Sequence, residues 1–308
     1  MVDWPRVAVV GAGAVGGYFG GVMADAGAPV VMIGRQPFVD AVKNRGLCLE
    51  TVQFQRYVQV DASTDIGAAR GADLVLFCVK TTDNAATAIE LAPVLSPGAL
   101  VVSLQNGVDN VEQIRAAANI EALPAAVYVA VSVPEPGHVK HISRGDLVVG
   151  PESAETRRVA AMFSRANIGC RISDNISGEL WTKLFWNCAL NAVSALGSAR
   201  YGRIKDHEEA RVLIQAIVDE VLAVARAANI VLPGIEDRHA AFAGSMRIAT
   251  QMAGAFSSTA QDVQRGKLTE IDSLNGYIAR RGKELGVPTP VNHTLFTLVK
   301  LLEGAAVR

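Results

Sequence analysis

The sequence has almost no net charge, few cysteines and no long apolar run. Its 29 basic and 30 acidic side chains leave a formal net charge of −1 at pH 7. Without a broad positive field the protein has little to hold a phosphate backbone, so nucleic acid is not an expected partner. No apolar run approaches the roughly 20 residues of a membrane span, and the segment before Arg6 lacks a signal-peptide pattern. Neither a membrane protein nor a secreted one is expected.

The four cysteines lie far apart and form no C-x-x-C pair: Cys48, Cys78, Cys170 and Cys188. They sit within apolar stretches, where a thiol behaves as a small hydrophobic group. This usage is typical of a reducing compartment, and we predict a cytoplasmic protein. The five histidines form no recognisable ligand set with cysteines or carboxylates, so no metal site is predicted.

The apolar content is high enough for two domains, since half of the 308 residues are hydrophobic. From residue 6 to residue 173, short β-branched runs alternate with helical patterns. Strands are predicted at residues 7–10, 30–33, 74–79 and 100–104, and helices up to about residue 26 and near residues 85–95. This alternation predicts a parallel sheet covered by helices on both faces.

The far edge of the sheet is expected to be mixed, because the runs 125–133, 139–142 and 147–150 have strand character without helices between them. After Ile172 nearly the whole chain has a helical period. Breaks are expected at Gly197, Tyr201-Gly202, Pro233-Gly234, Gly266, and Pro288 with Pro290. The second domain is therefore predicted to be almost all helix.

A glycine-rich turn follows the first predicted strand and opens the first helix: Gly11, Ala12, Gly13, Ala14, Val15 and Gly16. In this context the spacing predicts a dinucleotide-binding turn, whose helix N–H groups face a pyrophosphate. The alternative is a glycine-rich turn used only for packing. We therefore predict an α/β protein with a Rossmann dinucleotide-binding domain at residues 1–174 and an all-helical C-terminal domain at residues 175–308.

Arg35 stands where a carboxylate that binds the ribose 2′-hydroxyl of NAD would be expected, just after the second strand. A guanidinium at this place can bind a 2′-phosphate, which favours NADP. The alternative is an ordinary solvated arginine.

Two further predicted strands end in polar residues, Lys80 and Asn106. The carboxyl ends of parallel strands are natural places for ligand contacts. The alternatives are a lysine that merely leaves the sheet for water and an Asn106-Gly107 pair that forms an ordinary turn.

Lys183, Asn187 and Asn191 are spaced at i, i+4 and i+8 in the second domain, so they form one polar stripe on an otherwise apolar helix. Such groups are costly to bury unless they bind one another, water or a ligand. The alternative is that the stripe faces solvent.

Ser258 and Glu270 would lie about 18 Å apart on one unbroken helix, so they share a site only if the chain bends between them. Gly266 provides a break. Thr269 with Asp272 matches a capping box, which predicts a new helix with Glu270 in its first turn. Taken alone, Glu270 is more simply a helix-start acid.

These pieces together resemble the ketopantoate reductase (2-dehydropantoate 2-reductase) family over nearly the whole chain. The matching segments are the glycine turn, Val79-Lys80, Gln105-Asn106-Gly107, the polar stripe, Ser257-Ser258 with Gln261-Asp262, and Thr269-Glu270-Ile271-Asp272. The stripe combined with the Thr-Glu-Ile-Asp segment is the most specific part. The resemblance implies NADPH as cofactor and a hydroxyacid-dehydrogenase-like helical domain.

The resemblance also implies roles for individual residues. Lys183 would be the general acid, and Glu270 would help to anchor the substrate hydroxyl and the lysine. Asn106 would lie near the nicotinamide and the substrate, which Asn187 and Asn191 would also contact. Ser258 would hold the substrate carboxylate, and Arg35 and Lys80 would bind the cofactor.

The expected activity is NADPH-dependent reduction of 2-dehydropantoate, a step of pantothenate biosynthesis. In place of an asparagine that is common in the family, the loop after the stripe contains Tyr201, which leaves another small 2-oxo acid as an alternative substrate. A second alternative is a non-catalytic dinucleotide sensor on the same scaffold. A homodimer would be ordinary for such an enzyme.

Overall fold

The computed structural model of the chain describes residues 4–306, so the outermost residues of the two expected domains lie outside it. The chain folds as two compact units, Met1–Ile176 and Ser177–Arg308. The boundary lies two residues after the expected one. No helix within the described range is long and apolar enough to cross a membrane.

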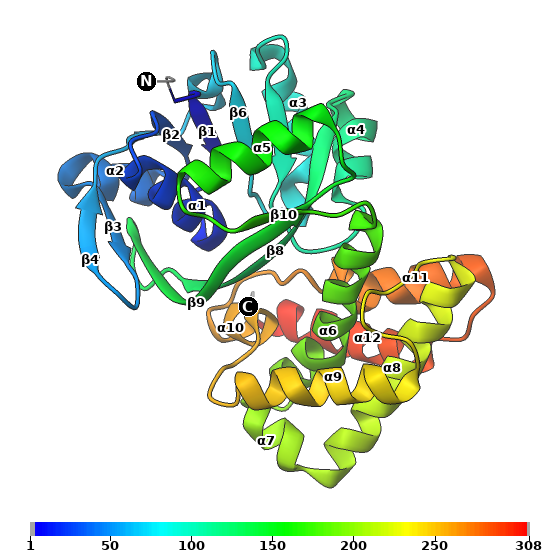
Figure 1. Cartoon of the computed structure of the whole chain (residues 1–308). Helices are drawn as coiled ribbons and strands as arrows, with labels where there is room; N and C mark the ends of the chain where they lie inside the picture. Colours follow the sequence, from blue (N-terminus) through cyan, green and yellow to red (C-terminus); the bar gives the residue numbers. More distant parts are fainter. Residues whose placement is uncertain (1–3, 307–308) are drawn as a thin grey trace. The chain divides into compact units, whose positions relative to one another are not determined.

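The first unit is built on a sheet whose strands run in the order β4-β3-β9-β8-β7-β6-β1-β2-β5, with β10 beside β9 (Figure 1). At its centre, β1 (Val7–Val10) pairs in parallel with β2 (Val30–Ile33) on one side and with β6 (Leu74–Phe77) on the other. β7 (Leu100–Ser103) and β8 (Ala122–Ser132) extend the parallel region. The chain thus reverses its direction of winding between β1 and β6, and ligands of such sheets bind at this point.

Helices cover both faces of the central strands, as the alternation predicts. Val7, Val9, Leu74 and Leu76 point into one core, which Phe19 of α1 (Ala14–Asp25) and Phe163 of α5 (Ala154–Arg165) complete. Neighbouring strand residues point into a second core with α3 (Asn84–Leu91) and α4 (Asn110–Ala118). Strands buried on both faces have continuous apolar runs, which is why they can be recognised in the sequence.

The mixed edge is confirmed, but its strands differ from the expected ones. Segment 139–142 and residues 147–149 of the other segment belong to a single strand, β9 (His138–Val149), which pairs antiparallel with β8. Two irregularities in the register of this pair, with Arg144 and Gly145 at positive φ, let the strand continue through the polar stretch between the two segments. A short β10 (Cys170–Ile172) joins β9 in parallel.

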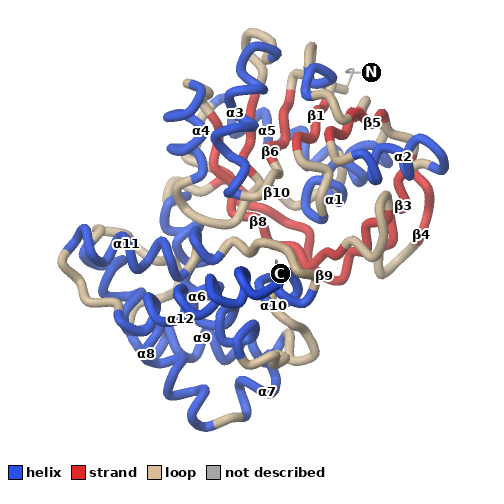
Figure 2. Tube along the Cα trace, turned by 180° about the vertical axis from the view of Figure 1, so that it is seen from behind, coloured by secondary structure: helices blue, strands red, loops and turns tan. Residues whose placement is uncertain are grey.

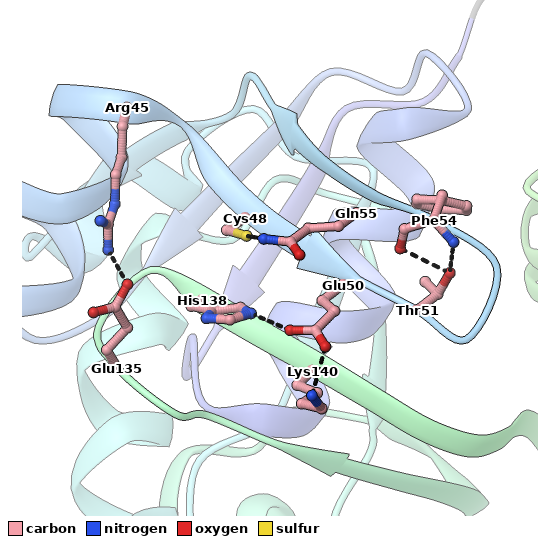
Figure 3. Close-up of polar contacts among 9 residues, drawn as sticks. All are labelled: Arg45, Cys48, Glu50, Thr51, Phe54, Gln55, Glu135, His138 and Lys140. Carbon is pink, nitrogen blue, oxygen red and sulfur yellow. Dashed lines mark hydrogen bonds and ion pairs between the residues drawn. The ribbon is translucent and has the colours of Figure 1, made fainter.

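Several segments lie outside the predicted elements, among them α2 (Gln36–Arg45), the hairpin β3 (Leu47–Glu50) with β4 (Gln55–Val58), and the short β5 (Asp61–Ser63). Figure 3 shows how the hairpin is fixed to β9. The Glu50 carboxylate accepts from His138 Nε2 at 2.8 Å and pairs with Lys140 Nζ at 2.6 Å. His138 and Lys140 are two residues apart, so they lie on one face of β9 and share one carboxylate.

The second unit contains only helices and connecting loops within the described residues (Figure 2). Its helices are α6 (Ile176–Leu196), α7 (Tyr201–Asp206), α8 (Glu208–Ala227), α9 (Arg238–Gln251), α10 (Ser258–Gln264), α11 (Asn275–Leu285) and α12 (Pro290–Ala306). The break expected at Tyr201-Gly202 is wrong, because both residues lie in the first turn of α7. The break at Gly266 is confirmed: α10 ends before it, and its φ is 62°.

Buried amide and carboxylate groups connect the helices of this unit. Asn275 Nδ2 donates to the Cys188 carbonyl at 3.2 Å and to Asn292 Oδ1 at 2.9 Å. The Glu220 carboxylate in turn accepts from the Val291 and Asn292 backbone N–H groups at 2.8 and 2.9 Å. These bonds fix the start of α12 against α8 and join α11 to α6, since a buried polar group without a partner is costly.

Candidate functional site

The glycine turn lies where the ends of β1, β2 and β6 meet. Gly11 and Ala12 donate to the Ile33 carbonyl at 3.0 and 2.9 Å, and Cys78 donates to the Val10 carbonyl at 2.7 Å. Gly11 has a φ of 100°, and a Cβ on it would lie 2.6 Å from the Val79 nitrogen. No residue with a side chain fits at this position, which fixes the turn.

Gly13 and Gly16 are glycines for different reasons. A Cβ on Gly16 would lie 2.3 Å from the Gly11 carbonyl oxygen, so packing of α1 on β1 requires glycine there. A Cβ on Gly13 would meet no atom within 4 Å, and the φ of Gly13 is −82°. Neither packing nor backbone strain explains this glycine. A close approach by a ligand would explain it, and the N terminus of α1, which no side chain caps, is suited to a pyrophosphate.

The other candidate cofactor residues follow neighbouring strands at the same edge. Arg35 is exposed, one residue beyond Gly34 at the end of β2, and it precedes α2. Lys80 is partly buried after β6, and Asn106 is partly buried after β7. Because β7, β6, β1 and β2 are consecutive in the sheet, the four predicted positions lie along one edge.

Buried amide side chains support the loops of Lys80 and Asn106, and of these only Gln105 stands out in the sequence, as part of the family resemblance. Gln105 Nε2 donates to the Val79 carbonyl at 2.8 Å and to Asn84 Oδ1 at 2.5 Å, and its Oε1 accepts from Ser103 at 2.8 Å. Asn84 donates to Asn110 Oδ1 at 2.9 Å, and Asn110 donates to the Asn106 carbonyl at 2.8 Å. The network therefore joins the ends of β6 and β7 through side chains that nothing in their local pattern marks as partners.

In the second unit, α6 carries the polar stripe as predicted. Lys183 and Asn187 are partly buried and Asn191 is buried, while Trp181, Phe185 and Leu190 contribute to the core around them. The solvent-facing alternative does not hold for Asn191, while Lys183 and Asn187 keep part of their surface exposed. Trp186 packs against α9, where a Cβ on Gly244 would lie 2.2 Å from its ring.

The loop before α10 is attached to the last turns of α6. Ser257 caps α10 by accepting from the Ala260 N–H at 3.0 Å, and it donates to the Asn191 carbonyl at 3.0 Å. Ser258, the first residue of α10, is exposed, and its Oγ lies 3.5 Å from Asn191 Nδ2. The structure thus brings two of the predicted residues, Asn191 and Ser258, together. A serine before a short helical run is a recognisable cap signal for Ser257.

The predicted capping box at Thr269 is wrong. A 3₁₀ turn, η4 (Ile271–Ser273), follows Glu270, and α11 begins only at Asn275. Thr269 is held instead by Glu303 of α12, whose Oε1 accepts from the Thr269 N–H at 2.7 Å and from its hydroxyl at 2.5 Å. Asp272, the expected partner, pairs with Lys300 Nζ at 3.0 Å. Glu303, 34 residues away, thus takes the place of the local capping partner that the sequence predicts. Its hydrogen bonds fix the loop that carries the partly buried Glu270.

Charge and burial act in opposite directions on Glu303. Burial alone would raise the pKa of this carboxyl, but hydrogen bonds from Lys300 and Thr269 outweigh it and lower the pKa below its usual value of 4.5. Lys300 Nζ lies 2.7 Å from Glu303 Oε2. The ionised carboxylate is therefore the form that stabilises this loop.

Family models match both units of the chain. Residues 7–153 match the model described as ketopantoate reductase PanE/ApbA, and residues 175–303 match the model of its C-terminal part. A 2-dehydropantoate 2-reductase of Pyrococcus horikoshii is 30% identical over 305 residues, which are 97% of this chain and 98% of the relative. Another, from Pyrobaculum aerophilum, is 31% identical over 307 residues, or 96% and 97% of the two chains.

Solved structures show the same similarity. A crystal structure of a PanE/ApbA family ketopantoate reductase from Ralstonia eutropha JMP134 superposes with a TM-score of 0.93 at 46% identity, covering 98% of this chain and all of that one (100%). A 2-dehydropantoate 2-reductase from Geobacter metallireducens GS-15 gives a TM-score of 0.89 at 26% identity, covering 96% and 99%. Both matches extend over the two units.

Replacing Glu303 should change how stability depends on pH. Because the pKa of Glu303 is lowered in the folded protein, its ionised carboxylate stabilises the fold fully at pH values above its pKa in the unfolded chain. This stabilisation is lost as the pH falls through the lower, folded-state pKa. We expect Glu303→Gln to lower the urea midpoint at pH 7, and the difference from the unmodified protein to shrink as pH falls below about 4.5. Glu284→Gln, at an exposed carboxylate paired with Arg281, is the control and should have little effect. A Glu303→Gln difference that is constant with pH would contradict this account.

Proposed function

Because the chain belongs to the ketopantoate reductase PanE/ApbA family, we propose that it catalyses NADPH-dependent reduction of 2-dehydropantoate to pantoate, a step of pantothenate and coenzyme A biosynthesis. The observation that carries the proposal is the polar face of α6, with Lys183, Asn187 and Asn191, to which the Ser257-Ser258 loop is bound. A dinucleotide sensor needs no such face. We also propose a cytoplasmic location, as the cysteine pattern predicts, and a homodimer remains a prediction.

The cofactor residues of the proposal belong to the first unit. The glycine turn from Gly11 to Gly16 would hold the pyrophosphate, Arg35 the 2′-phosphate, and Lys80 and Asn106 would contact the cofactor. The open position beside Gly13 supports this assignment, because it leaves backbone accessible to a phosphate. When bound, NADPH supplies the hydride for the keto carbon.

The residues of the second unit would bind the substrate and donate the proton. In the proposal the Lys183 ammonium stabilises the negative charge that develops on the keto oxygen and then donates a proton to it, which leaves a neutral amine and the product hydroxyl. Glu270 anchors that hydroxyl and the lysine. Asn187 and Asn191, together with Asn106 of the first unit, contact the substrate, and Ser258 binds its carboxylate.

The assay that tests the function follows the loss of NADPH absorbance with purified protein and 2-dehydropantoate, with pyruvate, 2-oxoisovalerate and no substrate as parallel reactions. We expect rapid, saturable oxidation with 2-dehydropantoate alone. Turnover of a different oxo acid instead would mean that the protein has the proposed chemistry but another substrate. Tight NADPH binding without turnover of any acid would favour a sensor.

Replacing Lys183 should affect the chemical step and spare cofactor binding. We expect Lys183→Ala to lower kcat by roughly 10²- to 10⁴-fold, because a positioned general acid acts mainly in the transition state. The dissociation constant of NADPH, measured by fluorescence titration, should stay nearly unchanged. Lys283→Ala, at an exposed position in the last turn of α11, is the control. Near-normal turnover in Lys183→Ala would remove this lysine from the acid role.

Replacing Arg35 should weaken NADPH binding far more than NADH binding, because only NADPH carries the 2′-phosphate. A charge-assisted hydrogen bond contributes about 1.5–3 kcal/mol, so we expect the Kd of NADPH to rise roughly 10- to 100-fold in Arg35→Ala. Arg45→Ala removes the same charge from the other end of α2, where the side chain pairs with Glu135, and serves as the control. Equal losses for the two cofactors would show that Arg35 does not select NADP.

A further inference from the structure

We propose that the Tyr201 hydroxyl, acting through the Asn191 amide, directs the Ser258 hydroxyl outward as a hydrogen-bond donor and thereby selects a substrate with a free carboxylate. We call these three side chains the Tyr201 relay. The inference deepens the proposed function and rests on it. Tyr201 is a positioning residue in this account, because it acts on the substrate through two other residues.

The relay begins at a buried phenol. Tyr201 is 6% exposed and Asn191 is 3% exposed, and the Tyr201 hydroxyl donates to Asn191 Oδ1 at 2.9 Å. Burial raises the pKa of Tyr201 well above its usual value, so the phenol stays protonated at physiological pH. A protonated phenol next to a carbonyl oxygen is a donor. The direction of the first hydrogen bond is therefore fixed.

The Asn191 amide then sets the direction of a second hydrogen bond. An asparagine side chain has one accepting oxygen and one donating nitrogen, so when the oxygen faces Tyr201 the NH₂ group faces the other way. That group lies 3.5 Å from Ser258 Oγ, at the long end of the range for a hydrogen bond. Because Ser258 Oγ accepts from Asn191, its own hydrogen is directed elsewhere. Ser258 is exposed, so the relay ends in a donor at the surface of this unit.

Hydrogen bonds to main-chain carbonyls hold the same parts in place independently of the phenol. The Tyr201 N–H donates to the Ala255 carbonyl at 3.0 Å, and the Gly202 N–H donates to the Ala253 carbonyl at 2.9 Å. Ser257 Oγ donates to the Asn191 carbonyl at 3.0 Å. The loop that carries Ser258 is thus attached to α7 through main-chain groups and to α6 through the Ser257 hydroxyl. Removing only the phenolic oxygen should leave this arrangement standing while freeing the Asn191 amide to turn.

A surface donor prefers an acceptor, and a carboxylate is the strongest acceptor that a small 2-oxo acid offers. If the Asn191 amide turned, its oxygen would face Ser258, and the Ser258 hydroxyl would donate to that oxygen. A lone pair of Ser258 Oγ, and not its hydrogen, would then face the substrate carboxylate. The Tyr201 hydroxyl therefore contributes to recognition of the carboxylate, not to reduction of the ketone. Its loss should appear in KM rather than in kcat.

The test compares Tyr201→Phe, Ser258→Ala and the double variant in the full-length protein, with the oxo acid that the unmodified protein reduces fastest. For Tyr201→Phe we expect KM to rise roughly 2- to 10-fold, as for loss of one hydrogen bond, with kcat and the Kd of NADPH nearly unchanged. The double variant should have the KM of Ser258→Ala, because the phenol acts only through that serine. Ser245→Ala, which removes a buried hydroxyl bound to the Ala241 carbonyl in α9, should leave KM unchanged.

A second measurement does not depend on turnover. Oxamate carries a carboxylate, and oxamide replaces it with a neutral amide, so titration of each in the presence of NADPH compares the two groups directly. We expect the unmodified protein to bind oxamate more tightly and Tyr201→Phe to narrow the difference. An unchanged KM and unchanged oxamate preference in a folded Tyr201→Phe protein would overturn the relay, as would KM losses that multiply in the double variant. If no oxo acid is reduced, the proposed function fails, and the oxamate titration still decides the relay.

Discussion

The first unit depends on one constraint, the close approach of the glycine turn after β1 to the end of β6. A Cβ at Gly11 would lie 2.6 Å from the Val79 nitrogen, so the two backbones meet without a side chain between them. This contact places the glycine turn beside the loop that begins at Lys80. The amide network of Gln105 and Asn84 then joins that loop to the end of β7. One steric requirement thus sets the edge along which all the proposed cofactor residues lie.

The central sheet could be predicted from the sequence because its strands are buried on both faces. Val7–Val10 and Leu74–Phe77 are continuous apolar runs, and short runs of this kind between glycine turns and helical patterns are typical of parallel strands. The hairpin at Leu47–Val58 lacks this signal. Its second strand, Gln55–Val58, is mostly exposed and polar. Its first strand pairs in parallel with β9, where Glu50 also meets His138 and Lys140. Pairing between residues so far apart leaves no periodic trace in a single sequence.

In the candidate site, too, features set by local spacing could be predicted and features set by distant partners could not. The stripe of Lys183, Asn187 and Asn191 could be predicted because helical spacing places these residues on one face whatever else packs there. The structure of the segment after Gly266 could not be predicted, because Thr269 donates to Glu303. No local pattern reveals that Thr269 has a partner in the last helix. Tyr201 stands out in the sequence only as a departure from a family pattern. Its hydrogen bond to Asn191 depends on how α7 begins, and the local sequence favours a break at that place.

Both units use neutral amides where a charged residue would also have provided hydrogen bonds. Gln105, Asn84 and Asn110 join the strand ends of the first unit, and Asn191 joins Tyr201 to Ser258 in the second. An amide both donates and accepts, so it transmits the direction of a hydrogen bond through a buried region without the cost of burying a charge. On the face of α6 this has a further consequence. In the proposed site, a carboxylate in place of Asn191 would repel the substrate carboxylate, whereas the amide would orient the hydroxyl proposed to bind it and leave Lys183 as the charged group of the stripe.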